Sequence, residues 1–127
     1  MPHRSRVGVV LVDVAPPEHG ATLAFWAGAT GREPSTSGDH GEFAALGLHG
    51  DVELAVQRTG EGTPARVHLD VETDDVAAEV ERLVGLGARV ERRHDEYAVL
   101  RDPAGLVLCV VPVQQAEAFD RAATTWP

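Results

Sequence analysis

The residues best suited to chemistry alternate along a stretch near the middle of the chain, residues 65–72. Every second side chain there is ionisable, namely Arg66, His68, Asp70 and Glu72. This is the period of a β-strand, so these side chains share one face and the apolar side chains between them share the other. The apolar face needs a helix or a second sheet to cover it. We expect the ionisable face to meet water, a cavity or a ligand, because burial without partners is costly.

A second group of polar candidates follows the same alternation in residues 51–57. Glu53 and Gln57 lie on the polar face there, while the other face is apolar. Glu53 and His68 are therefore expected to point into one cavity. Cys109 lies in an apolar run without an adjacent basic residue, so we expect a small buried apolar group rather than a nucleophile.

His68 is open to three interpretations. It is a pocket-wall histidine bonded to Glu53, Asp70 or a water molecule, a metal-free general base oriented by one of those carboxylates, or a metal ligand. An unperturbed imidazole pKa of about 6.5 suits the second role. The third needs more ligands, since catalytic metal sites usually have three and Asp70 or Gln57 adds one only if the geometry allows.

Composition excludes several classes of function. The chain has 127 residues and a formal charge of −9, which argues against nucleic acid and against an anionic membrane surface. The single cysteine fits a reducing cytosol. The apolar run at residues 7–12 is too short for a secretory signal or a membrane span. We expect one soluble cytoplasmic domain.

Hydrophobic periodicity and turn residues predict two similar halves, each in the order strand, helix, strands. The first half comprises a strand at 7–14, a helix at 18–29, a loop at 32–41 with a short edge strand, and a hairpin of 42–48 with 51–57. After a hinge at 59–64, the second comprises a strand at 65–72, a helix from 76 to 86 behind N-cap residues 73–75, a hairpin of 88–92 with 97–101, a turn at 102–105 and a strand at 106–111. The tail, 114–127, is expected to contain a helix at 116–123. Such an internal repeat decides the fold more firmly than any single element.

Helical spacing also predicts which side chains face the core. In the first helix these are Leu23, Trp26 and Ala27, and Phe25 is expected in the core as well. In the second helix they are Val76, Val80, Leu83 and Val84.

Several short segments together resemble one known superfamily. They are residues 23–26, Arg66 to Val71, Leu86-Gly87-Ala88, and residues 100–105 followed by 109–111. The chain resembles the vicinal oxygen chelate (glyoxalase / bleomycin-resistance / dioxygenase) superfamily, in particular its small actinobacterial-type glyoxalase-like domains. The resemblance implies an α+β fold of two tandem βαβββ modules that form a half-open barrel, often in a homodimer. Within a single domain, 1–127, module 1 spans about 7–58, module 2 about 65–113, and the tail 114–127.

The resemblance also implies a site. Metal-dependent members take ligands, usually His and Glu, from the first and last strands of each module. Those positions match His68 and Glu53, the candidate catalytic and metal-binding residues, and fall on Val9 and Cys109 at the two positions that depart from the pattern. Val9, Gln57, Asp70 and Cys109 are the expected pocket residues. We expect no organic cofactor. Whether the site binds a divalent metal ion stays open.

The preferred hypothesis is a small-molecule-binding protein with an incomplete metal site that sequesters an organic ligand. The alternative is a divalent-metal-dependent lyase, isomerase or dioxygenase acting on a substrate with vicinal oxygens through His68 and Glu53. A third hypothesis is a structural or interaction module whose half-open barrel holds no ligand. Whether the chain is an enzyme stays open at this point.

Overall fold

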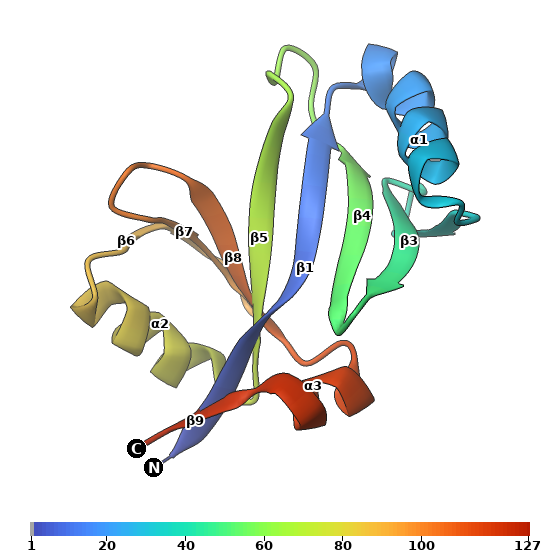
Figure 1. Ribbon diagram of the computed structural model, residues 1–127. Helices are drawn as coiled ribbons and strands as arrows, with labels where there is room; N and C mark the ends of the chain where they lie inside the picture. Colours follow the sequence, from blue (N-terminus) through green and yellow to red (C-terminus); the bar gives the residue numbers. More distant parts are fainter. Residues whose placement is uncertain (1) are drawn as a thin grey trace. The chain divides into compact units, whose positions relative to one another are not determined.

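The computed structural model describes residues 2–127, which fall into two compact units. One unit is Val9–Val67, and the other joins residues 2–8 to His68–Pro127. Strand β1 (His3–Val14) and strand β5 (Arg66–Thr73) each contribute residues to both units. Each unit is described below by itself (Figure 1).

The Val9–Val67 unit contains the second half of β1 and a four-element module. Its further elements are α1 (Pro16–Thr30), β2 (Ser35–Ser37), β3 (Phe43–His49) and β4 (Val52–Arg58). Strand β1 pairs in parallel with β4, which pairs antiparallel with β3, and β3 pairs antiparallel with β2. The first and last strands of the module are therefore neighbours.

The other unit repeats this plan and adds the tail. Its elements are the rest of β5, α2 (Val76–Gly85), β6 (Arg89–Arg93), β7 (Ala98–Arg101), β8 (Val107–Pro112), α3 (Ala116–Ala122) and β9 (Thr124–Trp126). Strand β5 pairs in parallel with β8, followed by antiparallel β7 and β6. Strand β9 pairs with the start of β1, which places Trp126 opposite His3 (Figure 1).

The identical strand order in the two units confirms the predicted α+β fold with tandem βαβββ modules. Strands β2 and β6 are edge strands in their units, so neither set of strands closes into a barrel. Among residues 2–127, no helix combines the length and the apolar character needed to cross a membrane.

The helix ends follow their capping residues. The Asp75 carboxylate accepts a hydrogen bond from the Ala78 amide at 3.0 Å, which satisfies a free donor at the start of α2. Gly31 ends α1 in the left-handed conformation, at φ 69°, where glycine is favoured because it has no Cβ.

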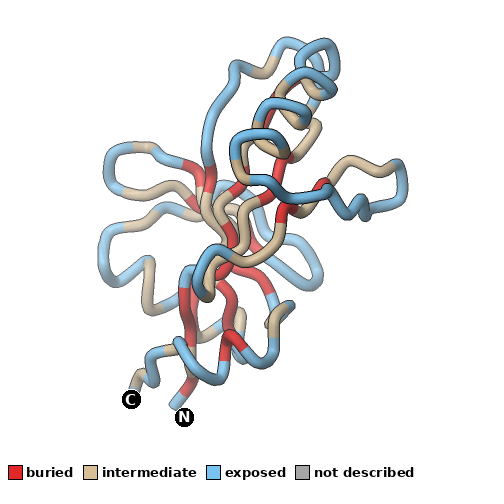
Figure 2. Tube along the Cα trace, turned by 45° about the vertical axis from the view of Figure 1, so that its right-hand side comes forward, coloured by how far each residue is buried: buried red, intermediate tan, exposed pale blue. Residues whose placement is uncertain are grey.

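Core predictions for the helices are confirmed except at two positions. Leu23, Trp26 and Ala27 pack against buried residues of their unit, and Val76 and Leu83 pack around the buried Val80. Phe25 and Val84 were predicted wrongly, since their exposed fractions are 64% and 44%. Phe25 belongs to α1, a helix without a buried residue (Figure 2).

The two faces of β5 are buried in a different way from that predicted. Val67 on the apolar face is 45% exposed, whereas Glu72 on the ionisable face is 0% exposed. Glu72 accepts hydrogen bonds from Arg6 Nε at 2.8 Å and from the amides of Gln114 and Gln115 at 2.7 and 3.1 Å. These partners offset the cost of burying the carboxylate.

Candidate functional site

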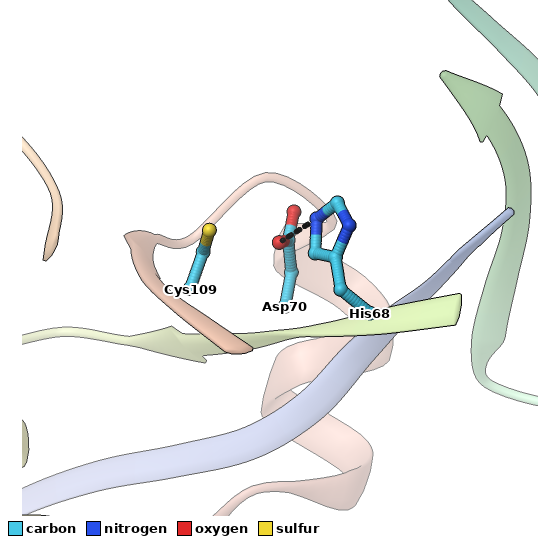
Figure 3. A group of neighbouring side chains, drawn as sticks. All are labelled: His68, Asp70 and Cys109. Carbon is cyan, nitrogen blue, oxygen red and sulfur yellow. Dashed lines mark ion pairs between the residues drawn. The ribbon is translucent and has the colours of Figure 1, made fainter. Parts of the chain in front are cut away.

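His68 and Asp70 on the ionisable face of β5 form a compact group of donor atoms with Cys109 on β8 (Figure 3). Each side chain offers one ligand atom, and these atoms all lie within 4.8 Å of one another. His68 Nε2 and Asp70 Oδ1 are 3.4 Å apart. His68 is only 6% exposed, and the other two side chains are half-buried.

Strand pairing explains why these residues meet. His68 and Asp70 are two positions apart on β5, so both point to the same face. Cys109 lies directly opposite Asp70 in the parallel β5–β8 ladder. Figure 3 shows all three side chains rising from the same side of these strands. The cluster therefore rests on hydrogen-bonded backbone rather than on loops.

A positive charge lies on the same face, further along the sheet. Val99 is opposite Cys109 on the neighbouring strand β7, and Arg101 is opposite Val107, so alternation places Arg101 on the face of Cys109. The guanidinium donates hydrogen bonds to Glu91 Oε1 at 3.2 and 3.1 Å and to the Gly105 carbonyl at 2.9 Å. It provides a partly exposed cation, ion-paired with Glu91, on the same face as the donor cluster.

Glu72, the second carboxylate on this face of β5, does not join the donor cluster. Glu72 alternates with Asp70 on β5, but both of its oxygens accept hydrogen bonds from Arg6 or from the amides before α3. Its hydrogen bonds with the amides of Gln114 and Gln115 fix the position of the start of the tail.

The remaining predicted site residues lie in the Val9–Val67 unit. Val9 is opposite Glu53 in the β1–β4 ladder and is 4% exposed. Gln57 is opposite Asp13, a carboxylate that is 0% exposed and accepts a hydrogen bond from Arg66 Nε at 3.1 Å. Valine offers no donor atom, so the four-ligand set implied by the superfamily does not fit this chain. The pairing of Glu53 with His68 stays a prediction, because the two residues belong to different units.

The sequence-based interpretation underestimated Cys109. It was expected to be buried and apolar, yet it is half-buried and shares a donor cluster. The repeat in the sequence could have indicated this cluster. A parallel pairing of the first and last strands of module 2 brings residues 106–111 beside residues 65–72.

A cavity of about 430 Å³ lies elsewhere, in the Val9–Val67 unit. It is lined by the start of α1 and the 61–65 loop: Val14, Ala15, Pro17, Glu18, Glu61, Gly62, Thr63, Pro64 and Ala65. None of the predicted site residues lines it, and its ionisable groups are two carboxylates. Its described lining contains no histidine or cysteine.

Comparisons with known proteins agree with this fold. The family model of the glyoxalase-like domain matches residues 9–111. Among solved structures, a hypothetical protein from Bacillus halodurans C-125 is 12% identical at a TM-score of 0.65, with 87% of this chain and 96% of that chain covered. No curated protein matches the chain.

Two further solved structures are methylmalonyl-CoA epimerases. One, in complex with methylmalonyl-CoA and NH4+, is 18% identical at a TM-score of 0.62, with 87% and 96% of the two chains covered. The other is a variant from Streptomyces coelicolor in complex with 2-nitronate-propionyl-CoA, 19% identical at a TM-score of 0.60, with 84% and 96% covered. At these identities the likeness shows the fold alone. Together with the family match over most of the chain, it establishes that this protein belongs to the glyoxalase-like domains of the vicinal oxygen chelate superfamily.

Proposed function

We propose that the chain binds a small organic ligand and lacks the metal-dependent turnover of the superfamily's enzymes. The observation that carries this proposal is Val9, which is opposite Glu53 where the superfamily pattern has a ligand. Valine has no atom that can ligate a metal, so the superfamily's ligand set is incomplete in this chain.

The ligand face supports the same proposal. His68 and Asp70 offer hydrogen-bond donors and acceptors on a rigid strand, and Arg101 offers a cation on the same face. Ligand sites typically combine apolar walls with a few such polar groups. A ligand with neighbouring oxygens and a negative charge matches this set. Glu53 and Gln57 are proposed to complete the pocket, and the protein is proposed to act in the cytosol as a homodimer that sequesters its ligand.

The competing function is a divalent-metal-dependent lyase, isomerase or dioxygenase built on His68 and Glu53. The structural likeness to methylmalonyl-CoA epimerases supports it, since one of these was solved with methylmalonyl-CoA bound.

A ligand screen with a product assay separates the two functions. The probes are bleomycin, catechol and methylmalonyl-CoA, each added to the purified protein with and without divalent ions. A binder raises its melting temperature with at least one probe, because a ligand of the folded state stabilises it, and it leaves the probe chemically unchanged. His68→Ala removes the rise in melting temperature.

Two outcomes contradict the proposal. Formation of a product that needs a divalent ion, and that is lost in both His68→Ala and Glu53→Gln, establishes the enzyme. If none of the probes changes the melting temperature, the result favours the hypothesis of an interaction module instead.

A further inference from the structure

We propose that His68, Asp70 and Cys109 form a binding site for a thiophilic divalent ion, Zn²⁺ in the first place. His68 and Cys109 occupy two of the superfamily's ligand positions, and Asp70 is proposed as a third ligand outside that set, so all three donors lie within the single unit that includes His68–Pro127. The inference goes beyond the proposed function and does not rest on it, since the ion binds whether or not an organic ligand follows.

The distances between the donor atoms suit a tetrahedral zinc ion. Zinc bonds of about 2.0–2.3 Å to nitrogen, oxygen and sulfur place neighbouring donors about 3.3–3.6 Å apart. His68 Nε2 and Asp70 Oδ1 are already 3.4 Å apart. The widest separation is at most 4.8 Å, so a closure of about 1 Å is needed to bring all three donor atoms to zinc-binding distance.

The chemistry of the donors selects the ion. Imidazole, carboxylate and thiolate are each zinc ligands, whereas magnesium and calcium prefer oxygen alone. The thiol proton leaves to solvent when the thiolate binds. One carboxylate and one thiolate then neutralise the two positive charges, which suits a half-buried position.

Strand geometry fixes the ligands and limits their number. Asp70 and Cys109 face each other across the β5–β8 ladder, and His68 follows on the same face. Glu72, the next residue of that face, is occupied by Arg6 and by the two amides before α3. Three protein ligands leave one coordination position open, as in zinc sites that bind substrate or water.

The simpler interpretation is an orienting contact between Asp70 and His68 beside an inert cysteine. It predicts that metal ions change nothing. Zinc binding accounts in addition for the position of Cys109, whose sulfur lies in the same group of donor atoms.

The test uses the full chain, stripped of metal and kept reduced, with Zn²⁺, Co²⁺ or Mg²⁺ as the probe. We expect one equivalent of Zn²⁺ to bind and to raise the melting temperature, and Mg²⁺ to have no such effect. Co²⁺ should give a thiolate-to-cobalt charge-transfer band and the strong visible bands of a four-coordinate ion. These readouts do not depend on any enzymatic activity.

The variants are Cys109→Ser and Asp70→Asn, with the exposed hairpin residue Asp95→Asn as the matched control. Cys109→Ser should abolish the charge-transfer band. Both site variants should weaken zinc binding by roughly 100-fold or more, since even loss of an outer hydrogen-bond partner costs about 10–100-fold. Circular dichroism of the metal-free variants checks folding, and either variant alone suffices if the other does not fold.

Three outcomes overturn the proposal. In the first the wild-type chain does not bind zinc, and in the second zinc binds equally well to the wild-type chain and to both site variants. If Glu53→Gln weakens zinc binding as much as Asp70→Asn does, a set closer to that of the superfamily holds the ion. Failure of every organic probe in the ligand screen would leave the zinc result unchanged, so the two proposals fail separately.

Discussion

At the scale of single residues, Glu79 shows how a carboxylate can be stable inside the protein. It is 0% exposed. Burial alone would raise the pKa of Glu79, but hydrogen bonds from Arg82, His3 and Ser5 outweigh it and hold the pKa below its usual value. Arg82 approaches with two nitrogens at 2.8 Å each, and His3 Nε2 lies 2.8 Å from Oε1. The ionised carboxylate therefore stabilises the folded state.

This pKa shift predicts a loss of stability in acid. The folded-state pKa of Glu79 lies below the ordinary glutamate value of 4.5, so the stabilisation is present above that value and is lost as the pH falls through the folded-state pKa. Glu79→Gln should lower the free energy of unfolding at pH 7 by about 1.5–3 kcal/mol and flatten its dependence on acid pH. Urea unfolding at several pH values measures both effects.

The matched control is Glu81→Gln, an exposed carboxylate on the same helix. It should change the free energy of unfolding by less than about 0.5 kcal/mol. An unchanged acid dependence in Glu79→Gln would show that other carboxylates govern acid unfolding.

Residue types could be predicted from the sequence, but their partners could not. His68, Asp70 and Cys109 were all singled out, because alternation and an apolar run place them on strands. Glu79 was not, since its partner His3 lies 76 positions away in sequence and no local pattern links them. Phe25 fits a core pattern by hydrophobicity alone, and only packing shows that it is exposed.

At the scale of elements, two glycines test how tightly strands and helices are packed. A Cβ added at Gly8 in β1 would lie 2.5 Å from Glu72 Oε1 and 2.6 Å from its Cγ and Cδ. Glu72 is held on several sides by hydrogen bonds, so it has little freedom to move. At Gly20 in α1, nothing lies within 4 Å of an added Cβ.

Alanine should therefore act in opposite directions at the two positions. Gly8→Ala should lower the free energy of unfolding by about 1–3 kcal/mol through overpacking. Gly20→Ala should raise it by about 0.5–1 kcal/mol, because glycine is costly inside a helix. Urea unfolding of the two variants measures both changes. A neutral Gly8→Ala would mean that the Glu72 carboxylate shifts aside without loss of its hydrogen bonds.

Helices and strands with a clear hydrophobic periodicity or a capping residue were predicted from the sequence. Those that depend on pairing with a distant segment were not. Helix α2 was found from its valine spacing and from Asp75, and the structure has it at Val76–Gly85. Strand β9 was missed because Thr124–Trp126 is too short to show alternation. The same pairing lengthens β1, which begins at His3 instead of residue 7.

At the scale of the whole molecule, the repeat was visible in the sequence, but the assignment of its strands to compact units was not. The start of β1, through Gly8, belongs with His68–Pro127, and the start of β5 belongs with Val9–Val67. Each first strand thus serves both units. The ion pairs agree with this division. Arg6 on β1 pairs with Glu72 in one unit, and Arg66 on β5 pairs with Asp13 in the other. Hydrophobic periodicity carries no information on such an exchange, since it reports only local faces.

The shared strands predict that the two units unfold together. Unfolding of either unit frees half of β1 and part of β5, and the remainder of each of these strands belongs to the other unit. The chain has two tryptophans, Trp26 in one unit and Trp126 in the other. In the single-tryptophan variants Trp26→Phe and Trp126→Phe, the fluorescence and far-ultraviolet circular dichroism transitions in urea should coincide. Trp126→Phe should lower both midpoints together, because it removes the hydrogen bond to Ser5 and weakens the contact with Arg82. A fluorescence midpoint well below the circular dichroism midpoint in either variant would show that one unit unfolds alone.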